Sequence, residues 1–376
     1  MKTIKMVGRK SIEIRENSVI RKLNIIKRAW PMILEGPNYV YSKIISKIAF
    51  YTKSAYAKPT RVIVLFTNRC NSQCLHCHSW KQNPRNKELG TGEWEWVFKE
   101  LRNWLGPVFL SITGGETLLR ADSIHLTKYA ASLGFWVEFL TNGYMMKPQL
   151  ASQLVGSGVK RIKISLDGSS QEVHDKIRGR SGFFLKATEA LRALTDEKHR
   201  QCKEVKIWAK TTIMSLNVED LPNILKLAKQ TGIDGVEFQA LEPVYYSDQL
   251  KDLKWFENNP LWVTDIKKLT EAIQKLRELK NQGYPIVNTI ENLNMIESYF
   301  NDPQKLAFRV HSHEYKKKDQ RCISWIGGLQ IMPDGGMKMC HWMDPFAYTR
   351  EGNIKLAWKN RDRCWKKPCP YILHNS

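Results

Sequence analysis

Six short runs of apolar and β-branched residues alternate with helix-like segments between residues 61 and 240, and this alternation limits the possible folds most strongly. The apolar runs lie at 61–68, 107–113, 135–141, 161–166, 205–213 and 235–240. The helix-like segments lie near 93–105, 121–133, 147–156, 183–194 and 219–231. Strands and helices that alternate at this spacing form parallel sheets with right-handed crossovers. Because a closed barrel needs eight units, the sequence predicts an α/β fold, a partial (β/α)6 TIM-like barrel. Functional residues should lie at the carboxyl ends of its strands.

Segments of different composition flank the predicted barrel core at 61–245. Residues 1–60 form a basic N-terminal extension. Residues 246–310 are mostly helix-like, with the longest candidate helix at 264–281, and we interpret them as a bridge. The remaining residues contain short strand-like pieces, a Pro-Asp-Gly-Gly turn and four of the eight cysteines. They predict a small C-terminal domain at 311–376.

Positive charge is concentrated at the amino end of the chain. The chain has 59 Lys and Arg against 37 Asp and Glu, a net charge of +22, and the first 61 residues hold 14 of these basic residues and three Glu. Apolar residues at helical spacing predict a short amphipathic basic helix there, at Tyr41, Ile44, Ile45, Ile48 and Tyr51. Its apolar stripe either packs on the rest of the fold or contacts an anionic membrane surface. No specific nucleic-acid motif accompanies the charge, so an RNA-directed role is less favoured.

Cysteine content and hydropathy bear on the compartment. Eight cysteines in 376 residues are too few and too unevenly spaced for a disulfide scaffold. The chain has no run of 18 apolar residues, and no secretory signal follows its basic start. We therefore expect a cytoplasmic, reducing location, with a peripheral position at the inner face of the membrane as the alternative.

Three cysteines follow the first predicted strand at the spacing Cys-x3-Cys-x2-Cys. Cys70, Cys74 and Cys77 could occupy three corners of a [4Fe–4S] cluster and leave the fourth iron without a protein ligand. A tetrahedral zinc site is the alternative, with His76 or His78 as its fourth ligand. The spacing by itself does not decide between the cluster and the zinc site.

This cysteine motif resembles that of the radical S-adenosylmethionine (radical SAM) enzymes, and the resemblance extends over roughly residues 61–245. The segment Thr113-Gly114-Gly115-Glu116 at the end of the second strand is similar to the family's GGE motif, which binds the methionine amino group. Ser165-Leu-Asp167-Gly168 after the fourth strand is similar to its ribose-contacting segment. His76 stands at the position that lies near the adenine. The resemblance thus implies that His76, Gly114, Gly115, Glu116, Ser165 and Asp167 bind SAM.

The family's chemistry implies a mechanism. Its members bind SAM at the open iron, and one electron from the reduced cluster cleaves SAM to methionine and a 5′-deoxyadenosyl radical. That radical abstracts a hydrogen atom from an unreactive C–H bond. The resemblance therefore implies SAM and a [4Fe–4S] cluster as cofactors, and an external one-electron donor such as a flavodoxin or ferredoxin as a partner. The protein would orient the reactants and exclude side reactions.

The tail resembles a second family element. Cys322-x12-Gly335-x4-Cys340 is similar to the opening of the SPASM domain that follows many radical SAM cores. A full SPASM domain has seven cysteines, whereas only Cys364 and Cys369 follow here, as in the shorter twitch version. The resemblance implies one auxiliary [4Fe–4S] cluster bound by Cys322, Cys340, Cys364 and Cys369. A structural zinc site with four cysteine ligands is the alternative.

The resemblance leaves the substrate open. Most SPASM and twitch relatives modify peptides or protein side chains, which implies a peptide substrate. The basic amino-terminal region motivates the alternative of a lipid or another membrane-associated small molecule. Sulfatase-maturating relatives place an Asp base directly after the second cysteine of the tail motif, where this chain has His341. His341 is therefore the candidate proton acceptor, and Asp344 is a further candidate.

Overall fold

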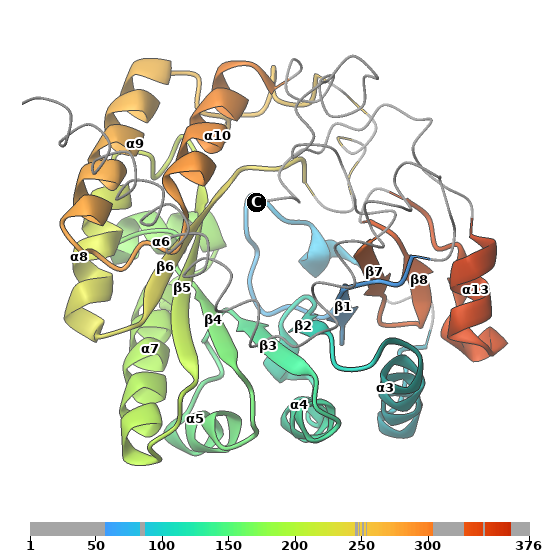
Figure 1. Cartoon of the computed structure of the whole chain (residues 1–376). Helices are drawn as coiled ribbons and strands as arrows, with labels where there is room; N and C mark the ends of the chain where they lie inside the picture. Colours follow the sequence, from blue (N-terminus) through green and yellow to red (C-terminus); the bar gives the residue numbers. More distant parts are fainter. Residues whose placement is uncertain are drawn as a thin grey trace, which may run out of the picture. The chain divides into compact units, whose positions relative to one another are not determined.

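The computed structural model describes five continuous stretches and three single residues of the chain: 57–82, 87–244, 247, 249, 252, 254–303, 327–340 and 343–361. The chain divides into two compact units, residues 1–58 and 59–376, and the second unit holds every helix and strand described below (Figure 1). The predicted amphipathic basic helix lies outside the described residues.

All six predicted strands are present and pair in parallel in the order of the sequence. They are β1 (Arg61–Leu65), β2 (Phe109–Thr113), β3 (Trp136–Thr141), β4 (Arg161–Ser165), β5 (Lys206–Ile213) and β6 (Gly235–Ala240). Helices connect successive strands, as right-handed parallel crossovers require. The predicted partial barrel is confirmed.

The helices match the predicted segments with two exceptions. They are α3 (Thr91–Leu105), α4 (Ser123–Ser132), α5 (Pro148–Val155), α6 (Gln171–Arg178), α7 (Phe183–Arg200), α8 (Leu221–Thr231), α9 (Ile266–Asn281), α10 (Ile290–Asn301) and α13 (Ile354–Asn360). Helix α6, which has eight residues and lies between β4 and α7, and helix α13 in the C-terminal part were not predicted from the sequence. Helices α9 and α10 lie in the segment interpreted as a helical bridge.

The sheet continues past β1 into the C-terminal part of the chain. Strand β7 (Gly328–Ile331) pairs in parallel with β1, and β8 (Gly336–Lys338) and β9 (Ala347–Tyr348) add antiparallel strands at the edge. The predicted Pro-Asp-Gly-Gly turn joins β7 to β8. Gly335 has φ +90° there, a conformation that favours glycine. The described part of the predicted C-terminal domain therefore shares one sheet with the barrel core.

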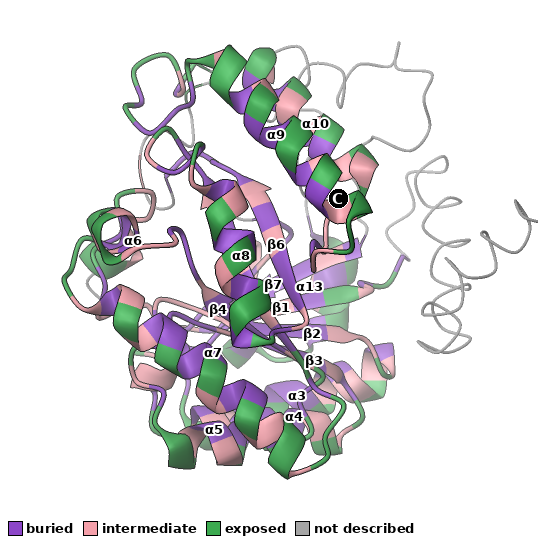
Figure 2. Cartoon of the chain, turned by 90° about the vertical axis from the view of Figure 1, so that its left-hand side faces the viewer, coloured by how far each residue is buried: buried purple, intermediate pink, exposed green. Residues whose placement is uncertain are grey.

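One face of the sheet is apolar and is covered by helices, whose exposed residues face away from the strands (Figure 2). In α3, Trp94, Val97, Phe98 and Leu101 are fully buried and recur at i, i+3, i+4 and i+7. The rings of Trp94 and Phe98 lie 5.2 and 6.3 Å from the ring of Phe66, which follows β1. The buried apolar residues of α3 thus fix the start of the loop after β1.

The opposite face of the sheet carries charged residues instead of the branched apolar residues that usually fill a barrel. Glu138 on β3 is 1% exposed and binds Arg161 Nε at 2.5 Å and Lys163 Nζ at 3.0 Å, both from β4. Lys163 also binds Glu237 on β6 at 2.7 Å. Burial alone would raise the pKa of Glu138, but the charges of Lys163 and Arg161 lower it to about 2.

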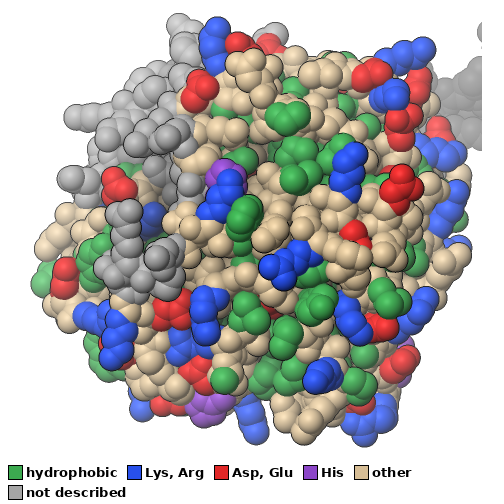
Figure 3. Space-filling model, turned by 180° about the vertical axis from the view of Figure 1, so that it is seen from behind, with side chains coloured by type: hydrophobic (Ala, Val, Ile, Leu, Met, Phe, Trp, Pro, Cys, Tyr) green, Lys and Arg blue, Asp and Glu red, His purple; other side chains and the backbone are tan. Residues whose placement is uncertain are grey.

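Two further observations concern the surface. Lys and Arg side chains alternate with Asp and Glu over the face shown in Figure 3, so this face does not form a patch of one sign. Among the described helices, none combines the length and the apolar character needed to cross a membrane.

We predict that Glu138→Gln destabilises the fold. The variant leaves Lys163 and Arg161 charged at a buried site, which should lower the free energy of unfolding by about 3–5 kcal/mol. Urea unfolding at pH 7 measures this change. Because the folded pKa of Glu138 is about 2 and the unfolded value 4.5, the difference between parent and variant should shrink as pH falls from 4.5 towards 2.

Glu219→Gln is the matched control, since Glu219 has a 69% exposed side chain and binds Lys268 at the surface. We expect a change below about 1 kcal/mol for this variant. Equal unfolding midpoints for Glu138→Gln and Glu219→Gln would contradict a stabilising role for the internal charges.

Candidate functional site

A cavity of about 240 Å³ lies at the carboxyl ends of the barrel strands, where the fold predicts function. Seven of the predicted site residues line it, and they come from the ends of three strands: Cys70, Cys74, His76, Cys77, Gly114, Gly115 and Ser165. The structure therefore brings together the cysteine motif, the glycine pair and the serine that the sequence analysis singled out.

The cysteine motif lies in the loop that follows β1, here called the Cys loop, residues 66–78. The Oγ atom of Ser72 lies 3.2 Å from Cys70 Sγ and 3.1 Å from Cys74 Sγ, so one hydroxyl bridges two of the thiols. Burial raises the pKa of the Cys70 and Cys77 thiols. Both are therefore protonated near neutral pH in the chain alone, and iron binding would displace their protons.

The glycine pair lies directly against the backbone of the Cys loop. Gly115 N donates to the Thr67 carbonyl at 2.7 Å, and Glu116 N donates to the Arg69 carbonyl at 2.8 Å. A Cβ atom on Gly115 would lie 2.3 Å from the Arg69 carbonyl oxygen, and one on Gly114 would lie 2.5 Å from the Thr67 carbonyl oxygen. The glycines are thus required by the docking of the loop, a reason that the sequence analysis did not identify.

The third member of this motif, Glu116, faces the protein interior. Its side chain is 1% exposed and does not line the cavity. Its carboxylate accepts hydrogen bonds from Thr141 Oγ1 at 2.5 Å, Asn142 N at 2.7 Å and Leu118 N at 3.0 Å. Glu116 therefore fixes the end of β3 to the glycine segment. Its predicted contact with SAM stays a prediction.

Ser165 and Asp167 occupy different surroundings after β4. Ser165 lines the cavity, whereas Asp167 is fully buried and does not. One Asp167 carboxylate oxygen accepts a hydrogen bond from Thr212 N at 2.8 Å, and the other lies 2.5 Å from Arg178 Nη2. The ribose contact predicted for Asp167 also stays a prediction.

His76 presents an unpartnered ring nitrogen at the cavity. Its Nδ1 atom is buried and has no hydrogen-bond partner among the described residues. Burial lowers the pKa of His76 to about 4, so the ring is neutral at pH 7. A neutral ring with a free nitrogen suits contact with a base such as adenine, the role that the sequence resemblance implies.

Two cationic residues of the cavity wall were not predicted from the sequence. Lys210 on β5 has no hydrogen bond or ion pair from its ammonium group to any described residue, and burial lowers its pKa. Arg178, at the end of α6, is 7% exposed. Lys210 could have been found as a charge within the apolar β5 run. Arg178 could have been found from the Ser170 N-cap and the Gly179 C-cap that delimit α6.

Only part of the predicted second cluster site lies within the described residues. Cys340 is 7% exposed and follows β8 by two residues. Cys322, Cys364, Cys369 and the candidate base His341 lie outside the described residues. Asp344 is exposed and does not line the cavity. Within the described stretches, no three His, Cys, Asp or Glu side chains are close enough to bind a single metal ion.

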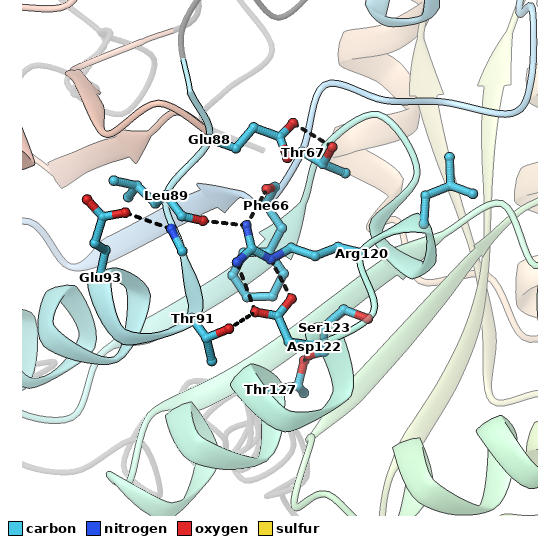
Figure 4. A network of polar contacts seen from close by, with 12 residues as sticks. Phe66, Thr67, Glu88, Leu89, Thr91, Glu93, Arg120, Asp122, Ser123 and Thr127 are labelled. Atoms are coloured by element: carbon cyan, nitrogen blue, oxygen red, sulfur yellow. Dashed lines mark hydrogen bonds and ion pairs between the residues drawn. The ribbon is translucent and has the colours of Figure 1, made fainter.

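A buried arginine joins the start of the Cys loop to the segment before α3 (Figure 4). Arg120 Nη1 donates to the carbonyl oxygens of Phe66 at 3.3 Å and Leu89 at 2.7 Å. Its Nε and Nη2 atoms donate to the Asp122 carboxylate at 2.6 and 2.9 Å. Because Phe66 precedes the cysteines by four residues, Arg120 fixes the point at which the loop leaves β1.

The segment before α3 also contacts the turn between β7 and β8. Leu89 N donates to the Pro333 carbonyl at 2.7 Å. Arg350 donates to the Glu93 carboxylate at 2.7 Å and to the Lys87 carbonyl at 3.1 Å. Residues 87–93 therefore connect the Cys loop to the hairpin that leads to Cys340.

The cavity suits an iron–sulfur cluster with a polar ligand beside it. Three thiols of one loop line the same cavity, which suits the thiolate ligands of such a cluster. The free His76 nitrogen and the unpaired Lys210 ammonium can each bind a polar group of a ligand. The residues present therefore fit both groups that the sequence resemblance implies.

Comparisons with known proteins cover the part of the chain that lines this cavity. Residues 64–228 match the radical SAM superfamily. An AdoMet-dependent heme synthase of Methanosarcina barkeri is 25% identical over 301 residues, 79% of this chain and 81% of that protein. The mycofactocin maturase of Mycolicibacterium smegmatis is 33% identical over 168 residues, 44% of this chain and 41% of that protein. The matched part of the chain thus spans less than half of the maturase.

Solved structures show the same fold. Streptococcus suis SuiB bound to its precursor peptide SuiA superimposes with a TM-score of 0.61 over 93% of this chain and 78% of SuiB, at 14% identity. The matched residues 64–228 include the Cys loop, the glycine pair, Ser165 and both cavity cations. The part of the chain that carries this site therefore forms a radical SAM domain.

Proposed function

We propose that this chain is a radical SAM enzyme that abstracts a hydrogen atom from a C–H bond of a peptide substrate. The observation that carries the chemistry is the lining of one cavity by Cys70, Cys74 and Cys77 together with Gly114 and Gly115. The similarity to a mycofactocin maturase, and the fold shared with SuiB, support the choice of a peptide. No comparison favours a lipid substrate.

Six of the residues that line the cavity have a defined task in this proposal. A [4Fe–4S] cluster bound by the three cysteines would supply the electron that cleaves SAM. Lys210 would pair with a carboxylate of the bound ligand, because its ammonium is unpaired at a half-buried position. His76 would contact the adenine as a neutral ring, and the Ser165 hydroxyl would bind the ribose.

We further propose that Cys322, Cys340, Cys364 and Cys369 bind an auxiliary [4Fe–4S] cluster. The burial of Cys340 and the connection of its hairpin to the Cys loop support this assignment. Such a cluster could accept the electron that remains after hydrogen abstraction. His341 is the proposed proton acceptor, with Asp344 as a second candidate, and a flavodoxin or ferredoxin is the proposed external donor.

A tetrapyrrole is the second candidate substrate. The heme synthase of Methanosarcina barkeri matches this chain over most of both proteins, which favours a related reaction on a porphyrin. The unpaired Lys210 is compatible with this candidate, because porphyrin side chains carry carboxylates.

One experiment separates the two substrates. The anaerobically reconstituted enzyme is incubated with SAM and reductant, and either with peptides encoded beside its gene or with iron coproporphyrin III. Mass spectrometry then detects a mass change in one substrate. A modified peptide supports the proposal, and a modified porphyrin with unchanged peptides supports the second candidate.

Contact of residues 1–60 with an anionic membrane also stays a proposal, supported by their positive charge. Co-sedimentation with anionic liposomes, compared between the full chain and a chain that begins at Lys58, measures it. Equal binding of the two chains at low and moderate salt would argue against this contact.

We predict different losses for the two groups of cysteines. The reconstituted chain should bind about eight iron ions, four in each cluster. Replacement of Cys70, Cys74 and Cys77 by Ala should abolish formation of 5′-deoxyadenosine. Replacement of Cys364 and Cys369 by Ala should keep this cleavage but end substrate turnover. Cleavage of SAM at the parental rate in the triple variant would show that the core site is assigned wrongly. A content of four iron ions and one zinc ion per chain would exclude the auxiliary cluster and leave the assignment of the core cluster intact.

We also predict that Gly115→Ala removes the core cluster. The added Cβ atom would meet backbone oxygen atoms of Arg69 and Asn68, so the Cys loop must move. Iron content should fall by about four ions per chain. Gly92→Ala is the control, because a Cβ atom at Gly92 has no atom within 4 Å. Full iron content in Gly115→Ala would mean that the loop can bind a cluster without this docking contact.

A further inference from the structure

The end of α6 binds a different part of the Cys loop from the part that the glycine pair binds. The carbonyl oxygens of a helix's last turn have no partners within the helix. In α6, the Ile177 carbonyl accepts a hydrogen bond from Leu75 N at 3.0 Å, and the Arg178 carbonyl accepts one from Gln73 N at 2.9 Å. These two contacts lie on either side of Cys74.

Gly179 permits this close approach. It ends α6 with φ +69°, a left-handed conformation that favours glycine. A Cβ atom at Gly179 would lie 2.3 Å from the Gln73 carbonyl oxygen. The contact between the helix end and the Cys loop therefore depends on backbone atoms on both sides, which fixes the position of Cys74.

The guanidinium group of Arg178 lies between Cys74 and a buried carboxylate. Its Nη1 atom donates to Cys74 Sγ at 3.5 Å, and its Nη2 atom lies 2.5 Å from Asp167 Oδ2. Its Nε atom is buried without a hydrogen-bond partner among the described residues. Arg178 lines the cavity, whereas Asp167 is fully buried and does not line the cavity.

The surroundings of Asp167 hold this ion pair in one geometry. Asp167 accepts a hydrogen bond from Thr212 N through its side chain and one from Asn217 Nδ2 through its carbonyl group. Its own backbone N–H donates to His174 Nδ1 at 3.0 Å, and His174 lies on α6. Strand β5, the loop after β4 and helix α6 thus contribute to a single fixed arrangement.

The charges of this arrangement would affect the reduction potential of a cluster bound at Cys74. The carbonyl groups at the end of α6 bring partial negative charge towards the Cys loop. A cluster with thiolate ligands is anionic, and its potential depends on local charge and on hydrogen bonds to its sulfur atoms. The cation of Arg178 offsets the negative charge and donates to a ligand sulfur, whereas Asp167 reduces the effect of that cation.

We propose that Arg178 and Asp167 are positioning residues that set the reduction potential of the cluster at Cys70, Cys74 and Cys77, with Arg178 raising it and Asp167 lowering it. This inference rests on the proposed function, because it requires a cluster at the Cys loop. Asp167 would thus act on the cluster through Arg178 and Cys74, in addition to any contact that it makes with a ligand.

The test is a redox titration of the full chain, followed by electron paramagnetic resonance in the absence of SAM. A parallel sample with SAM assigns the core cluster, because only a cluster with an open iron changes its spectrum when SAM binds. Arg178→Gln should lower the potential of this cluster, and Asp167→Asn should raise it. We expect at least a tenfold change in the ratio of reduced to oxidised cluster at fixed solution potential, about 59 mV for one electron.

Two further variants keep the test decisive. Arg178→Gln leaves Asp167 charged and buried, which can prevent folding. The double variant Arg178→Gln with Asp167→Asn removes both charges and keeps the side-chain sizes similar. Its potential should lie between those of the parent and Arg178→Gln, since Arg178 is nearer to Cys74. Arg178→Lys keeps the charge and should restore part of the parental potential.

Arg180→Gln is the matched control, because it removes an exposed positive charge two residues from Arg178. It should leave the potential unchanged. Shifts of the same sign in Arg178→Gln and Asp167→Asn, or unchanged potentials at full iron content, would overturn the inference. A parent chain with no SAM-responsive cluster would overturn the proposed function instead.

Discussion

The fixed position of the Cys loop is the constraint on which the rest of the site depends. Backbone hydrogen bonds hold the loop at two places: the glycine segment binds Thr67 and Arg69, and the end of α6 binds Gln73 and Leu75. Backbone contacts of this kind leave no room for a Cβ atom, which explains glycine at positions 115 and 179. A three-cysteine cluster site needs such a support, because its ligands must already lie around one cavity before iron binds.

The interior of the barrel is polar, and we attribute this to the site at the carboxyl ends of the strands. A barrel filled by branched apolar side chains would be more stable in isolation, since buried ion pairs gain little over well-packed apolar residues. Here Glu138, Lys163 and Glu237 form a fixed ion network, and Lys210 extends the series of charges to the cavity. The interior thus sets an electrostatic environment beneath the cavity, which an apolar filling could not provide.

The sequence predicted the parts of the fold that follow from local pattern. Strands at 161–165 and 235–240 were predicted within one residue, because each has apolar residues at every second position, the period of a strand, between turn residues. Helix α6 was missed because only one of its three buried residues is apolar; they are His174, Ile177 and Arg178. A buried arginine has no apolar signal, and its partners Asp167 and Cys74 lie 11 and 104 residues away. Contacts of that kind depend on tertiary structure.

The sheet also determines how the C-terminal hairpin is placed relative to the cavity. Strand β7 runs parallel to β1, so its turn lies at the same edge of the sheet as the Cys loop. Strand β8 returns in the opposite direction, and Lys338 pairs with Gln330, which carries the chain away from that edge before Cys340. Cys340 is accordingly absent from the cavity lining among the described residues. A cluster bound there would lie away from the edge of the sheet that carries the Cys loop, which suits a role in electron transfer better than a role in binding SAM.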